Sequence, residues 1–87
     1  MSGLKAIRLT AHAIEQCAER GTDESEVREA IRIGKAEDAK SGRKLYRHNG
    51  VFGNRWKGKY YKFKQVAPVV VEEDNEIVVV TVYAFYF

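Results

Sequence analysis

The first clear pattern in the chain is an amphipathic stretch close to its start. At about 100° per residue, the small and apolar side chains between Ala11 and Arg20 fall on one side of a helix, and the polar ones fall on the other. Thr10 offers a hydroxyl that can cap the helix N-terminus. Gly21 stands where a left-handed glycine commonly ends a helix. The pattern therefore predicts a helix over Ala11–Arg20.

A second helix is predicted directly after the first. Asp23 and Glu26 have the spacing of a capping box, in which each side chain accepts a hydrogen bond from the backbone N–H of the other residue. Gly34 stops the helical pattern. The i, i+3, i+4 spacing of a buried stripe is supplied by Val27, Ala30 and Ile31. Two short helices joined at Gly21-Thr22 form a helical hairpin, which we expect to lie on a sheet.

Beyond Gly34 the pattern is that of strands. The strand-like segments, one of which precedes the helices, are residues 4–9, 35–40, 43–48, 59–65, 69–71 and 77–87. The last is an unbroken run of β-branched and aromatic residues, so we expect a central strand that the helices cover on at least one face. Pro68 predicts a sheet edge or a bulge. The fold class is therefore α+β, with an N-terminal helical hairpin packed on an antiparallel sheet in one domain over residues 1–87.

Glycine-containing and polar pairs mark the expected turns of the sheet. The turn signals are Ser41-Gly42, Asn49-Gly50, Gly53-Asn54, Lys57-Gly58 and the acidic hairpin turn Glu73–Glu76. Three of them fall within ten residues of one another, so residues 49–58 read as a loop rather than as one strand.

Length and composition narrow the class of protein. The 87 residues suit one domain, and the apolar run Ile77–Phe87 falls short of the roughly 20 residues of a membrane-spanning helix. The first residues lack the apolar segment of a secretory signal. Cys17 is the one cysteine, so no internal disulfide is expected and a reducing cytoplasm is the default location. One Cys and two His cannot form a Cys/His zinc site, and no cofactor is implied.

Charge is segregated along the chain. The formal net charge is only +3, from 15 basic and 12 acidic residues. Residues 1–38 carry a net −2 and residues 66–87 a net −4, whereas residues 39–65 hold nine basic residues and no acidic one. A block of +9 is a local field that attracts polyanions whatever the total charge of the chain.

The same basic block is rich in aromatic residues. Lysine and arginine neutralise phosphates, and aromatic faces stack the unpaired bases of single-stranded nucleic acid. We therefore predict that RNA or another single-stranded nucleic acid contacts Lys44, Arg47, Arg55, Trp56, Lys57, Lys59, Lys62 and Lys64. The alternative is a soluble sheet with a lysine-rich exposed face and an aromatic core.

A second candidate site is the polar face of the first helix. His12, Gln16 and Arg20 are spaced i, i+4, i+8 and form one ladder. A neutral imidazole in the first turn can act as a general base, and an arginine can hold a phosphate through two hydrogen bonds. The alternative is a solvated face on which Glu19 and Arg20 pair locally.

Other reactive side chains have plainer interpretations. Cys17 falls on the apolar side of the first helix and is expected to be a buried packing residue. His48 precedes a turn signal and is expected to be a solvated turn residue. Thr81 and Tyr83 share one face of the last strand, where Tyr83 either donates a proton or hydrogen bond to a phosphate or packs in the core.

A series of short motifs resembles a known family. The motifs are Thr10-x-His12-Ala13, Glu19-Arg20-Gly21, Glu26-Val27-x-x-Ala30-Ile31-x-x-Gly34 and Val80-Thr81-Val82-Tyr83. They resemble a family of small bacterial and archaeal domains of unknown function with a His-Ala…Arg-Gly helix and a closing Thr-Val-Tyr strand. Those domains are similar to the RelE/ParE-type toxin superfamily, in which two helices pack on a curled antiparallel sheet. The resemblance covers most of the chain, but the segment Asn49–Gly58 does not align with it.

The resemblance implies a toxin–antitoxin function. It implies metal-independent cleavage of RNA by an endoribonuclease, with His12, Arg20 and Tyr83 as catalytic residues and an acidic antitoxin-like protein as a partner. A non-catalytic nucleic-acid-binding module and a protein-partner-binding module are both open alternatives, because each would use the same basic, aromatic sheet. Whether the protein is an enzyme is open on the sequence alone.

Overall fold

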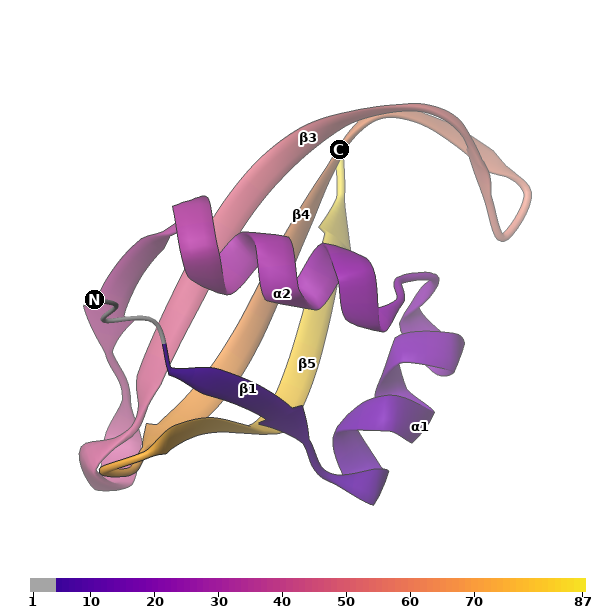
Figure 1. Cartoon of the computed structure of the whole chain (residues 1–87). Helices are drawn as coiled ribbons and strands as arrows, with labels where there is room; N and C mark the ends of the chain where they lie inside the picture. The colour runs from indigo at the N-terminus through magenta and orange to yellow at the C-terminus, as the bar shows by residue number, and fades with distance from the viewer. Residues whose placement is uncertain (1–4) are drawn as a thin grey trace.

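Two α-helices, one short 3₁₀ helix (Lys40–Gly42) and five strands form the regular structure of residues 5–87, the part of the chain that the computed structural model describes (Figure 1). In chain order the α-helices and strands are β1 (Ala6–Leu9), α1 (Ala11–Arg20), α2 (Glu24–Ile33), β2 (Lys35–Asp38), β3 (Lys44–Trp56), β4 (Lys59–Glu72) and β5 (Glu76–Tyr86). The predicted α+β class is confirmed. The predicted first strand starts at Leu4, which lies outside the described residues. No helix in this part of the chain is long and apolar enough to cross a membrane.

The strand order of the sheet is β1-β5-β4-β3-β2. Neighbouring strands from β2 to β5 are antiparallel, as the sequence predicts. β1 instead runs parallel to β5, with Ile7 opposite Ile77, so the sheet is mixed rather than antiparallel throughout. The two strands are far apart in the chain, and no hairpin turn fixes their relative direction. β5 lies between β1 and β4, which confirms the predicted central position of the last strand.

The first helix begins and ends where the sequence predicts. The Thr10 hydroxyl accepts a hydrogen bond from the N–H of Ala13 at 3.1 Å, and Gly21 ends the helix with a φ of 76°. Both helices contribute to one hydrophobic core with the sheet. Its most buried members include Ala13, Cys17, Val27, Ala30, Ile31, Val66, Val70, Val79 and Val82.

The second helix keeps only half of the predicted capping box. The Asp23 carboxylate accepts a hydrogen bond from the N–H of Glu26 at 2.8 Å, as predicted. The other predicted bond, in which the Glu26 carboxylate accepts from the backbone N–H of Asp23, is not formed. The Glu26 carboxylate instead accepts hydrogen bonds from the Thr22 hydroxyl and the Lys64 ammonium, both at 2.7 Å. A charged donor from β4 therefore replaces the local backbone donor.

Two predicted turns, Asn49-Gly50 and Gly53-Asn54, are wrong. β3 runs through both as a single strand of 13 residues paired with β4. A bulge in the register before Asn54 accommodates Gly53, whose φ is 57°. The turn at Lys57-Gly58 is confirmed, with φ values of 51° and 84°.

The β3–β4 hairpin extends beyond the end of β5. The last cross-strand pair of β5 joins Tyr86 to Lys64, and Phe87 then exchanges two backbone hydrogen bonds with Phe63. Residues 51–62 lie past this point and are called the arm below. Figure 1 shows the arm curving away from the rest of the sheet.

Pro68 lies in the interior strand β4 rather than at a sheet edge, and the predicted bulge is confirmed. It lies opposite Val82 on β5, and the register of these two strands shifts between Val69 and Val70. On its other side, pairing with β3 stops at Val69 and resumes at Val66. The missing N–H of the proline thus falls where the ladder is interrupted.

α1 takes the place of β1 along the second half of β5. The pairing of β1 with β5 ends at Val79, whose carbonyl accepts a hydrogen bond from the N–H of Thr10 at 3.1 Å. Three residues further, the side-chain carbonyl of Gln16 accepts a hydrogen bond from the N–H of Val82 at 2.8 Å. Gln16 is only 7% exposed. Gln16, the middle residue of the predicted ladder His12, Gln16 and Arg20, is therefore packed against β5 and is not solvated.

Candidate functional site

Two open grooves flank the Arg20 side chain at the end of α1. The arm groove has a volume of about 590 Å³ and is lined by Glu19, Arg20, Trp56, Lys57, Ala84 and Tyr86. The sheet groove has a volume of about 550 Å³ and lies on the sheet face away from the helices. Its lining includes the bases Lys40, Arg43 and Arg47, the acids Glu37 and Asp38, and Thr81, Tyr83 and Phe85. Arg20 joins the two, because it lines the first groove while its guanidinium carbon lies 5.4 Å from the ring centroid of Tyr83 in the second.

The Arg20 side chain has no acidic partner. Within residues 5–87, no carboxylate oxygen lies within 4.0 Å of its guanidinium, so the predicted local pair with Glu19 is not formed. Its Nε is buried and has no hydrogen-bond acceptor in the described chain. A buried guanidinium N–H without an acceptor is costly. Because Nε is enclosed by protein atoms, an anion in the arm groove would contact the rest of the guanidinium and not Nε itself.

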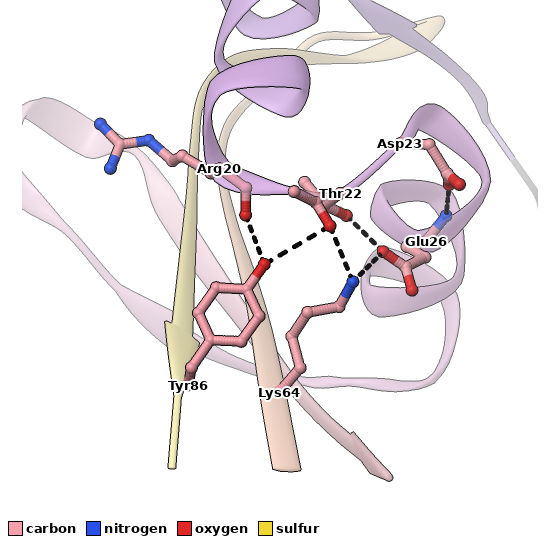
Figure 2. A network of polar contacts seen from close by, with 7 residues as sticks. Arg20, Thr22, Asp23, Glu26, Lys64 and Tyr86 are labelled. Atoms are coloured by element: carbon pink, nitrogen blue, oxygen red, sulfur yellow. Dashed lines mark hydrogen bonds and ion pairs between the residues drawn. The ribbon is translucent and has the colours of Figure 1, made fainter. Parts of the chain in front are cut away.

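The backbone at the end of α1 is held by side chains from the last two strands (Figure 2). The Tyr86 hydroxyl donates to the carbonyl of Arg20 at 2.5 Å, and the Lys64 ammonium donates to the carbonyl of Gly21 at 2.9 Å and to Glu26. Burial raises the pKa of the Tyr86 phenol, which keeps it a neutral donor. Figure 2 shows the Arg20 guanidinium pointing away from this cluster, so the backbone is fixed while the side chain stays available.

Aromatic rings anchor the arm to the same place. The Trp56 ring stacks on Tyr86 with centroids 5.2 Å apart, and Phe52 and Tyr61 contact the same ring at 5.2 and 5.6 Å. Gly21 leaves room for them, since a Cβ there would lie 2.6 Å from the Trp56 ring. The segment that reads as a loop in the sequence is thus a strand pair fastened to the helix end.

The predicted basic block divides into two groups in the structure. Within residues 5–87, four exposed arm cations, Arg55, Lys57, Lys59 and Lys62, have no carboxylate within 4.0 Å. Lys57 and Lys59 instead lie over the rings of Trp56 and Tyr61, at 5.5 and 5.6 Å. Of the six cations in the basic block that have no carboxylate partner within residues 5–87, four lie on the arm, and the other two are Lys40 and Arg43.

Three other predicted nucleic-acid contacts, Lys44, Arg47 and Lys64, form ion pairs with acidic residues of the protein itself. Arg47 pairs with Glu37 at 2.6 Å, and Lys44 pairs with Glu72 at 3.7 Å. Lys64 is the most enclosed, with a side chain only 10% exposed beside Glu26. These acids lie outside the basic block in the sequence, and the sheet and helix packing brings them to it.

The structure brings together two of the three predicted catalytic residues. Tyr83 lies beside Arg20 and is 39% exposed, so the alternative of core packing is wrong. Thr81 lines the same groove, as the predicted shared face requires. His12 is exposed in the first turn of α1 and lines neither groove. It is eight residues before Arg20, or roughly 12 Å along the helix axis.

Two further candidates are resolved by their surroundings. Cys17 is 5% exposed, and burial raises the pKa of its thiol, so the predicted packing role is confirmed. His48 is not a turn residue: it is half-buried in β3 opposite Val66.

Phe85 and Tyr86 were not predicted as site residues, and Lys40 and Arg43 belong to the predicted basic block but not to its predicted contacts. The alternation of side chains along β5 would have placed Phe85 beside Tyr83. No local signal reveals Tyr86, because its role depends on the end of a helix 66 residues earlier in the chain. Among residues 5–87, no three His, Cys, Asp or Glu side chains lie close enough together to hold a metal ion.

The fold and the two grooves define a small α+β protein with a cationic hairpin arm fastened to the end of its first helix. Over residues 9–84 the chain matches the family described as Domain of unknown function (DUF4258), and it belongs to that family. Neither the curated proteins nor the solved structures gave a significant match. The family agrees with the resemblance to domains of unknown function, while the relation to RelE/ParE toxins stays a prediction.

Proposed function

We propose that this protein binds single-stranded RNA across Arg20, with the phosphates held by Arg20 and by the cations of the arm. The observation that carries the proposal is the Arg20 guanidinium, which lines the arm groove, lies over Tyr83 of the sheet groove and, within residues 5–87, has no carboxylate oxygen within 4.0 Å. A phosphate oxygen is the acceptor that such a group binds most strongly.

The distribution of charge supports the same partner. The four arm cations face solvent without acidic partners, and each phosphate they neutralise releases a counterion. The acidic turn between β4 and β5 lies at the other end of these strands from the arm. A polyanion is therefore drawn to the end of the molecule that also carries Arg20.

Binding is tested with a fluorescently labelled single-stranded RNA and anisotropy over a range of salt concentrations. We expect Arg20→Gln and the double variant Arg55→Gln/Lys57→Gln each to weaken binding about tenfold or more and to reduce the salt slope by about one for each cation removed. Arg32→Gln, an exposed arginine on α2, is the matched control and is expected to leave affinity unchanged. Equal affinity of all four proteins would contradict the proposal.

A finer proposal is that the bound RNA is cut, as in a toxin-type endoribonuclease of the RelE/ParE kind. The 2′-hydroxyl would lose its proton to a base and attack the adjacent phosphorus, while the 5′-oxygen leaves with a proton from an acid. The products are a 2′,3′-cyclic phosphate and a 5′-hydroxyl. Arg20 would neutralise the pentacoordinate phosphorane, and Tyr83 beside it would protonate the leaving oxygen. His12 is the base that the sequence predicts, but it lies roughly 12 Å along α1 from Arg20 and lines neither groove, so only the His12→Ala variant assigns it that role.

Cleavage is tested by incubating RNA with the protein and a chelator, followed by mass spectrometry of the fragment ends. We expect the wild type to release 2′,3′-cyclic phosphates, and Arg20→Ala and Tyr83→Phe to be slowed about 100-fold or more. Tyr83→Phe keeps the ring that carries Arg20, so its loss of rate isolates the hydroxyl. If the wild type binds RNA but leaves it intact, or if His12→Ala cuts at the wild-type rate, the catalytic assignment is rejected and the binding function stands.

A further inference from the structure

The sheet face away from the helices exposes four aromatic rings. Phe63, Tyr83, Phe85 and Phe87 are 42%, 39%, 46% and 54% exposed. Val51 begins the arm beside them and is 87% exposed. We call these four rings the aromatic face. A contiguous apolar patch on so small a protein marks a binding surface.

The rings form a continuous row that starts at the proposed phosphate site. Tyr83 carries the Arg20 guanidinium, and its ring lies 6.2 Å from that of Phe85 at an interplanar angle of 22°. Phe87 follows two residues later on the same face of the strand, and its ring lies 5.7 Å from that of Phe63 on β4. The row therefore leads from Arg20 to the base of the cationic arm.

We propose that the aromatic face stacks unpaired bases of the RNA strand whose phosphates are held at its two ends, an inference that rests on the proposed function. Every base has a π-face, and rings on an open sheet surface stack bases without requiring a sequence. Arg20 lies at the Tyr83 end of the row and the arm begins at the Phe87 end, which fits a strand with its phosphates outside and its bases on the rings. The acids Glu37 and Asp38 also line the groove that contains Tyr83 and Phe85. The ligand is thus a single strand of at least a few nucleotides, not a duplex.

Charge argues against a second copy of the chain as the occupant. A two-fold contact through the aromatic face would place the same surface of each copy, with its Arg20 and its arm, against that of the other. The arm carries four cations and no acid, so the two surfaces would repel each other. A polyanion with aromatic bases satisfies both the charge and the apolar area.

The test replaces the rings with aliphatic side chains in the full chain. Phe85→Leu and Phe87→Leu keep an apolar surface and remove stacking, so each is expected to weaken single-stranded RNA binding about tenfold, while Phe85→Tyr and Phe87→Tyr keep wild-type affinity. Ile33→Ala, a 60% exposed apolar residue on α2, is the control. Thermal melting checks that the exposed substitutions leave the fold intact.

A second readout measures stacking directly. An RNA containing 2-aminopurine, whose fluorescence falls when it stacks, is expected to be quenched by the wild type and by the Tyr variants, but not by the Leu variants. If Arg20→Gln weakens binding and the Leu variants neither weaken it nor restore the fluorescence, the stacking inference fails and the proposed function stands. If no RNA binds at all, the proposed function itself fails. A dimer in sedimentation that Phe85→Leu disrupts would assign the face to self-association and overturn the inference.

Discussion

Replacing Gly21 with alanine is expected to lower the free energy of unfolding by about 3 kcal/mol. Gly21 has a φ of +76°, a left-handed conformation that costs a residue with a side chain about 1–2 kcal/mol. The new Cβ would also lie 2.5 Å from the Tyr86 hydroxyl and 2.6 Å from the Trp56 ring, and relieving that overlap adds about 1–3 kcal/mol. Urea unfolding measures the change, which corresponds to a fall in Tm of roughly 12 to 24 °C.

The matched control for this substitution is Gly42→Ala. Gly42 has a nearly equal φ of +72°, and nothing lies within 4 Å of a Cβ built there. It therefore carries the backbone strain without the steric overlap, and we expect a loss of only about 1–2 kcal/mol. Similar losses for the two variants would show that Trp56 and Tyr86 yield freely, and the arm would then not be anchored at the helix end.

The chain contains a single tryptophan, which separates a local effect from a global one. Trp56 packs against Tyr86 and beside Gly21. If the overlap in Gly21→Ala is relieved by moving the arm, the native emission of Trp56 shifts to longer wavelength, whereas Gly42→Ala leaves it unchanged. The same displacement widens the arm groove, so RNA affinity is expected to fall in Gly21→Ala alone.

The helices could be predicted because their boundaries are set by local chemistry. The hydroxyl of Thr10, the carboxylate of Asp23 and the absent Cβ of Gly21 act within four residues of the backbone they stabilise. The turn signals at Asn49-Gly50 failed for the opposite reason. Gly50 pairs with Lys64 and the Asn49 side chain accepts a hydrogen bond from Gln65, so contacts with β4 outweigh the local turn preference.

The position and direction of the first strand depend on contacts across the whole chain. The hydrophobic pattern of β1 identifies a strand, but its parallel pairing with β5 joins residues about 70 positions apart. The ladder of α1 shows the same limit. The helical spacing of His12, Gln16 and Arg20 could be predicted from the sequence. The burial of Gln16 could not, because Gln16 pairs with the N–H of Val82, which has no strand partner on that side once the pairing of β1 with β5 ends at Val79.

The candidate site was partly accessible from the sequence. Charge segregation identified the basic block, and the shared face of Thr81 and Tyr83 follows from strand alternation. Which cations are unpaired could not be predicted, since Glu26, Glu37 and Glu72 come from three different elements. The fold neutralises Lys44, Arg47 and Lys64 and leaves the arm cations, together with Lys40 and Arg43, without a carboxylate partner within residues 5–87.

Replacing Lys64 with methionine is expected to lower the free energy of unfolding by about 2–3 kcal/mol. Methionine fills a similar volume but cannot donate to the Gly21 carbonyl, at 2.9 Å, or to the Glu26 carboxylate, at 2.7 Å. The ammonium also lies 5.3 Å from the centroid of the Phe52 ring, an interaction that the thioether replaces only in part. Urea unfolding of the variant and the wild type measures the loss.

Lys62→Met is the control, because Lys62 is an exposed lysine two residues away with no carboxylate partner in residues 5–87. The effect of Lys62→Met on the free energy of unfolding is expected to stay within about 0.5 kcal/mol. A double-mutant cycle with Glu26→Gln should assign about 1–2 kcal/mol of coupling to Lys64 alone.

RNA binding is expected to depend on Lys62 and not on Lys64, the reverse of their effects on stability. Lys62→Met should reduce the salt slope by about one, whereas Lys64→Met, well below its melting temperature, should leave the slope unchanged, because its charge is neutralised by Glu26. A reduced slope in Lys64→Met would instead return Lys64 to the nucleic-acid contacts that the sequence predicts.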